Sequence, residues 1–184
     1  MKTREEALAL LKTYTESDAL LKHAYAVEAV MRRFAPRFGG DAEYWGLVGL
    51  LHDVDYDRWP EEHLAVAPRL LAQAGFDEAF IRAVLAHGYG LCTEVKPELP
   101  VEKTIYTIDE LTGLITAAAL MRPSRSVVDI EVKSVKKKFK DKHFAAGVNR
   151  DVILSGCDML GLTLDEVIAE CIEGMRTVHE ALGL

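Results

Sequence analysis

Apolar residues recur at helical spacing along most of the chain. Within residues 18–34, Leu20, Val27, Val30, Met31 and Phe34 lie on one face of a helix. The same spacing predicts helices over 4–14, from 42 to about 53, from 61 to 73, from 78 to 87, from 101 to 120, and two or three more between 127 and 182. No segment alternates apolar and polar residues as a half-buried strand does, so the pattern predicts an all-α fold.

Short polar residues and prolines predict where these helices begin. The expected N-caps are Ser17 or Asp18, Asp41 and Asp77. The residues "TLDE" at 163–166 predict a capping box at the start of the final helix. Pro60 is expected to open the fourth helix, because proline suits a first helical turn. Pro68 should then kink that helix or mark its true start.

Composition narrows the class of protein. The chain has 184 residues, of which 49% are apolar, and this suits one domain with a sizeable core. No apolar run reaches membrane-spanning length, and the first residues lack a signal-peptide core. The three cysteines show no paired spacing. We therefore expect a cytoplasmic protein without disulfides.

Charge is distributed unevenly. The formal net charge of −7 argues against general nucleic-acid binding. Membrane association is not expected either. Residues 133–142, "KSVKKKFKDK", nevertheless hold six lysines and one aspartate. Such a run is usually a solvated helix face, and the alternative is a basic rim beside an anion site. The candidates for neutralising a substrate phosphate are Lys136, Lys137, Lys140 and Arg150.

Several histidines and aspartates lie on or beside the apolar faces of the predicted helices. They are His23, His52, Asp53, His63, His87 and Asp109. One such group could be a core residue satisfied by a hydrogen bond, but burying a polar group unpaired costs about 1–3 kcal/mol. A divalent cation satisfies all of them together, because imidazole and carboxylate are ligands for zinc, iron, manganese, cobalt or nickel. The pattern predicts a metal site.

These residues resemble the HD-domain superfamily of metal-dependent phosphohydrolases. His23, then His52 and Asp53 in "LLHDVDY", then Asp109 match the order of its ligands over roughly residues 18–120. The resemblance implies a helical bundle with a buried metal at its centre. Residues 1–184 would form one domain, in which 121–184 are a helical extension packed on the HD core. The chain looks most like the small stand-alone bacterial predicted hydrolases of this superfamily.

The resemblance also raises the possibility of two metals. In two-metal branches of the superfamily, two further histidines follow the HD pair, one opening a helix and one ending the next helix. His63 and His87 match those places, and Asp53 would then bridge the two ions. With one metal, His63 and His87 would instead contact substrate or support the ligands. One or two divalent transition-metal ions per chain are therefore expected.

The implied activity is hydrolysis of a small phosphate ester or nucleotide by a metal-activated water. Besides Asp53, the acidic residues that could orient water or accept a proton are Asp55, Asp57 and Glu110. Two other functions fit the same ligands. A carboxylate-bridged pair of irons could activate dioxygen, as in a few oxygenases of the superfamily, or the metal could be structural in a binding module without turnover.

Overall fold

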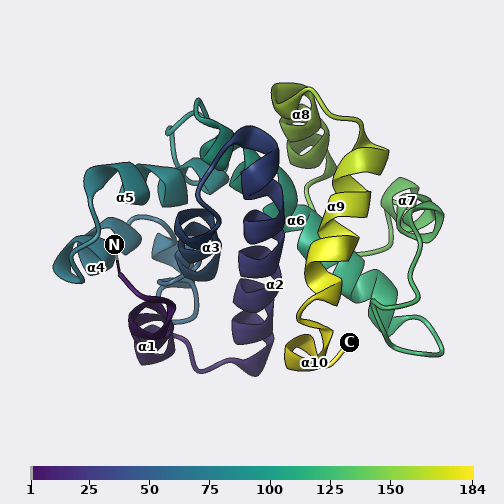
Figure 1. The fold of residues 1–184 in the computed structure, drawn as a ribbon, viewed down its shortest axis with the longest axis horizontal. Helices are drawn as coiled ribbons and strands as arrows, with labels where there is room; N and C mark the ends of the chain where they lie inside the picture. The colour runs from purple at the N-terminus through teal and green to yellow at the C-terminus, as the bar shows by residue number, and fades with distance from the viewer. Residues whose placement is uncertain (1) are drawn as a thin grey trace.

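Helix α2 (Asp18–Phe34) is the element around which the fold is built (Figure 1). The structure is a computed structural model and describes residues 2–184. Val27, Val30, Met31 and Phe34 have no exposed surface, as the helical spacing predicted. Helix α2 packs mainly against α3 (Ala42–Leu51), α6 (Pro100–Leu120) and α9 (Leu164–Arg176).

Shorter helices surround this centre. They are α1 (Arg4–Tyr14), α4 (Ala67–Gln73), α5 (Glu78–Leu85), α7 (Val132–Lys140), α8 (Arg150–Leu160) and α10 (His179–Leu182). Three 3-10 turns, η1 (Ala35–Phe38), η2 (Pro60–Glu62) and η3 (Ala86–Gly88), join them. Residues 2–184 contain no β-strand, which confirms the all-α prediction. None of the helices described is long and apolar enough to cross a membrane.

The predicted N-caps form. The side chains of Ser17, Asp41 and Asp77 each accept a hydrogen bond from a backbone N–H in the first turn of α2, α3 and α5. Thr163 and Glu166 form the predicted capping box of α9. One detail of that prediction is wrong, because α9 is not the final helix: the single-turn helix α10 follows it.

The predicted fourth helix is shorter than expected. Pro60 opens only the 3-10 turn η2, and α4 begins at Ala67 with Pro68 in its first turn. Pro68 therefore marks the true start of the helix, because a proline inside a helix would lack an N–H donor and clash with the preceding turn. His63 consequently does not open a helix but lies in the connection between η2 and α4.

Close packing of α3 on α2 sets the geometry of the site. A Cβ atom at Gly49 would lie 2.9 Å from the carbonyl oxygen of Val27, so only glycine fits there without a shift of the backbone. This contact brings the end of α3, with His52 and Asp53, next to His23 on α2.

Candidate metal centre

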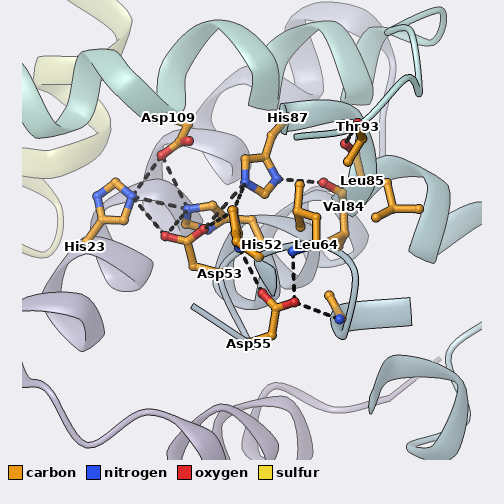
Figure 2. Close-up of polar contacts among 12 residues, drawn as sticks. His23, His52, Asp53, Asp55, Leu64, Val84, Leu85, His87, Thr93 and Asp109 are labelled. Carbon is orange, nitrogen blue, oxygen red and sulfur yellow. Dashed lines mark hydrogen bonds and ion pairs between the residues drawn. The ribbon is translucent and has the colours of Figure 1, made fainter. Parts of the chain in front are cut away.

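Three polar side chains meet beside one oxygen of Asp53. His23 lies within α2, Asp109 lies within α6, and His52 and Asp53 follow the last residue of α3. Nε2 of His23 is 2.9 Å from Oδ1 of Asp109 and 3.2 Å from Nε2 of His52. Oδ2 of Asp53 is 3.3 Å from Nε2 of His52 and 4.0 Å from Nε2 of His23. These four residues are the first ligand group (Figure 2).

A second group meets the other oxygen of Asp53. Nε2 of His63 and Nε2 of His87 are 3.2 Å apart, and they lie 3.4 and 3.5 Å from Oδ1 of Asp53. His87 belongs to η3, directly after α5. The structure thus brings together all six residues that the sequence suggested as ligands, with the Asp53 carboxylate between the two groups.

The tautomers of two histidines follow from their backbone contacts. Nδ1 of His52 is 2.8 Å from the carbonyl oxygen of Gly49, and Nδ1 of His87 is 2.6 Å from that of Val84. A carbonyl oxygen can only accept, so each Nδ1 carries the proton and donates it. Nε2 points into the cluster and is the nitrogen left to bind a metal in place of a proton, which is how metal-binding histidines are held.

Asp55 holds the Nδ1–H of His63 as the two backbone carbonyls hold those of His52 and His87. The sequence did not reveal this role. The carboxylate of Asp55 is fully buried, and Oδ1 accepts the Nδ1–H of His63 at 2.9 Å. Oδ2 accepts the backbone N–H groups of Leu64 and Ala67, so Asp55 also holds the connection before α4 in place (Figure 2). Asp55 is therefore a support for a ligand and does not line the pocket that opens onto the ligand groups.

The electrostatics of the cluster favour a cation. Burial disfavours the charged form of His52, but Asp53 and Asp109 outweigh burial and raise the pKa of His52 well above its usual value. Burial likewise opposes ionisation of Asp53 and Asp109, yet the neighbouring histidines lower the pKa of each carboxyl. The two carboxylates are thus ionised in a confined space and attract positive charge.

The donor set suits a divalent transition metal. The ligand atoms of His23, His52 and Asp109 lie within 4.8 Å of one another, and so do those of His52, Asp53 and His87. Imidazole nitrogens and carboxylate oxygens are ligands for zinc, iron, manganese, cobalt and nickel. Together with the fixed tautomers, this convergence shows that the residues present fit such an ion.

A pocket of about 380 Å³ opens onto both ligand groups. Five of the six proposed ligands line it: His23, Asp53, His63, His87 and Asp109. The other lining residues are Tyr56, Gly88, Leu91, Cys92, Glu110, Gly113, Gly147 and Val148. Glu110, next to Asp109 on α6, accepts a hydrogen bond from the backbone N–H of Asn149 at 3.2 Å. Burial, then the charge of Asp109, raises the pKa of Glu110.

Asp57, one of the acidic candidates, lies outside this pocket. Its Oδ2 accepts the backbone N–H groups of Glu16 and Ser17, at 2.8 and 3.0 Å, and so fixes the connection between α1 and α2. These bonds lower the pKa of Asp57. The interpretation of Asp57 as a residue that orients water is therefore corrected to a structural one.

The basic candidates also lie outside the pocket lining. Lys136 forms an ion pair with Asp165 on α9 at 2.7 Å, and Lys137 and Lys140 are exposed on α7. Arg150 donates to backbone carbonyl oxygens within residues 139–148, among them that of Val148 at 3.1 Å. Arg150 thus holds this segment together, and none of the four lines the pocket.

Tyr56, Leu91 and Val148 were not suggested by the sequence as site residues. Because Tyr56 follows His52 and Asp53 so closely in the sequence, an aromatic residue near the ligands could have been predicted. The sequence does not show, however, that its side chain lines the pocket. Its ring meets that of His63 edge-on, with centroids 5.1 Å apart. Leu91 and Val148 come from connections whose position depends on the folded chain.

Fold and site together define an all-α protein with a histidine–aspartate centre suited to divalent metal. The family model of the HD domain matches residues 20–114, which is just over half of the chain. The chain belongs to the HD-domain family, as its resemblance implied. HD domains bind divalent metals and their superfamily consists mostly of hydrolases. No solved structure matches the chain.

Proposed function

We propose that this protein is a metal-dependent phosphohydrolase that acts on a small phosphate ester or nucleotide and holds two metal ions. One observation carries the proposal. Asp53 presents one carboxylate oxygen to each ligand group, and both groups face an open pocket. Paired sites that share a carboxylate suit displacement at phosphorus, where the attacking and leaving oxygens both need stabilisation.

The site residues would have separate roles in binding metal and in accepting a proton. His23, His52 and Asp109 would hold one ion and His63 and His87 the other, with Asp53 touching both. When bound, such ions polarise a phosphoryl group and lower the pKa of water. Glu110 lines the same pocket, and its carboxylate would accept a proton there. The Asn149 N–H orients that carboxylate.

A panel assay tests the proposal. Purified protein is incubated with phosphate esters and nucleotides in Mn²⁺, Co²⁺, Ni²⁺, Fe²⁺ or Mg²⁺, and released phosphate is measured. We expect turnover that Asp53→Ala abolishes and that Asp57→Ala, a matched loss of a carboxylate outside the pocket, leaves intact. Oxygen consumption by the iron-loaded protein without phosphate release would instead indicate an oxygenase, and bound metal without any turnover would indicate a binding module.

A further inference from the structure

The lining of the pocket carries negative charge only, apart from its histidines. Asp53, Asp109 and Glu110 line it, and within residues 2–184 no lysine or arginine does. This is unusual for a site that is to receive a phosphorylated compound, because proteins commonly neutralise phosphate charge with lysine and arginine.

An adjoining cavity does not change this balance. A cavity of about 340 Å³ shares His23 and Gly113 with the pocket, and the basic residue in its lining is Lys22. Nζ of Lys22 lies 2.8 Å from Oδ2 of Asp18, so its charge is already paired. Positive charge for a substrate therefore has to come from the metal ions themselves.

The charge that two ions supply is limited. Two divalent ions bring four positive charges, and the three lining carboxylates offset up to three of them. A phosphomonoester carries a charge of about −1.5 to −2 near neutral pH, and a surplus of one positive charge offsets at least about half of it. Each further phosphate adds at least one more negative charge, for which the pocket has no side-chain cation. Unbalanced charge near carboxylates is repelled, and the repulsion is stronger where water is excluded.

The mouth of the pocket is apolar. Tyr56 and Leu91 line it and remain 41% and 57% exposed, although large apolar side chains favour burial. Val148 belongs to the same lining. An aromatic ring and an aliphatic side chain at the mouth offer contact area to a flat, apolar group. They offer little to a small, fully hydroxylated compound.

We propose that the pocket selects a compound with a single phosphate group and a flat or apolar body, such as a nucleoside monophosphate or an aryl phosphate, whose body lies against Tyr56 and Leu91. The inference rests on the proposed phosphohydrolase function and narrows its substrate class. Di- and triphosphates are poor substrates because no lysine or arginine meets their additional charge.

A charge series tests the selection directly. Turnover of one nucleoside as its mono-, di- and triphosphate is compared at constant free Mn²⁺, and we expect kcat/KM to be at least about tenfold higher for the monophosphate than for the triphosphate. Leu91→Lys places a cation at the exposed mouth and should narrow this ratio severalfold, whereas Leu91→Gln should not. Equal or better use of the triphosphate by the unaltered protein would overturn the inference.

A binding measurement provides a readout besides activity. Calorimetry of the Mn²⁺-loaded protein with phenylphosphonate and methylphosphonate, which are not hydrolysed, should show tighter binding of the phenyl compound. Tyr56→Ala should remove most of this preference without changing metal content, and Tyr56→Phe should keep it. Equal binding of both phosphonates to the unaltered protein would contradict the role of the apolar mouth.

These results separate the inference from the function on which it rests. Absence of turnover for every phosphate ester, with the phosphonate preference intact, would refute the phosphohydrolase and leave the pocket's binding preference standing. Turnover that favours polyphosphates would refute the selection and leave the phosphohydrolase standing.

Discussion

At the scale of single residues, the second nitrogen of each histidine matters as much as the one that faces the cluster. The backbone carbonyls of Gly49 and Val84 take the Nδ1–H of His52 and His87, while His63 depends on the side chain of Asp55. A carbonyl cannot be removed by substitution, but a side chain can. Asp55 is therefore the support whose contribution can be measured.

Asp55→Asn should weaken the site that contains His63. The single amide oxygen cannot accept from His63 and also from both Leu64 and Ala67 as two carboxylate oxygens do. Loss of such a supporting bond typically costs about 10–100-fold in metal affinity. A metal titration should show that one ion per chain binds this much more weakly while the other is unchanged. Two unaltered affinities in a folded variant would contradict the role given to Asp55.

Asp57 should matter for stability and not for turnover. Two backbone N–H groups lower its folded-state pKa, so its contribution to stability is present above the unfolded pKa of about 3.9 and is lost as the pH falls through the folded value. Asp57→Ala should lower the melting temperature at pH 7, and the difference from the unaltered protein should shrink in acid. Thermal unfolding at several pH values checks this. A difference that is the same at every pH would exclude the carboxylate as its source.

At the scale of elements, helix caps could be predicted from the sequence, whereas a structural bond between residues distant in the chain could not. Caps such as Asp41 and Asp77 could be predicted because a cap bonds to N–H groups two or three residues away. The role of Asp57 could not, because its partners Glu16 and Ser17 are about forty residues away in the chain. The six ligands were found because buried polar residues on apolar helix faces, together with the family resemblance, point to one centre.

The crossing of α2 and α3 holds two parts of that centre together. Gly49→Ala would place a methyl group against the backbone of Val27 and Glu28, and overpacking of this kind typically costs about 1–3 kcal/mol. Because α3 carries His52 and Asp53 at its end, metal affinity should fall as well.

Gly113→Ala is the matched control for that substitution. A Cβ at Gly113, within α6, meets no atom within 4 Å, so alanine should stabilise the helix by about 0.4–1 kcal/mol. Denaturant unfolding of both variants checks the pair. Equal effects of the two substitutions would show that the close approach of α2 and α3 is not what requires glycine at position 49.

At the scale of the whole molecule, the acidic centre and the basic helix are separate features. The ligands come from α2, α6, the end of α3 and the connections around α4 and α5. Helix α7, whose sequence holds the lysine run, lies beyond α9 in Figure 1. Helices that are far apart in the chain thus surround one pocket. In the proposed function, the acidic charge of that pocket would leave the neutralisation of the substrate's charge to the metal ions. The number of metal ions is therefore the property on which both the proposed chemistry and the substrate selection depend.

Metal content per chain is the most direct test of that account. Metal analysis of metal-replete protein should give two ions for the unaltered chain and one for His63→Ala and for His87→Ala, because His23, His52, Asp53 and Asp109 remain to hold the first ion. Asp53→Ala, which removes the carboxylate between the groups, should weaken both. One ion per chain in the unaltered protein and in both histidine variants would contradict the paired site around Asp53.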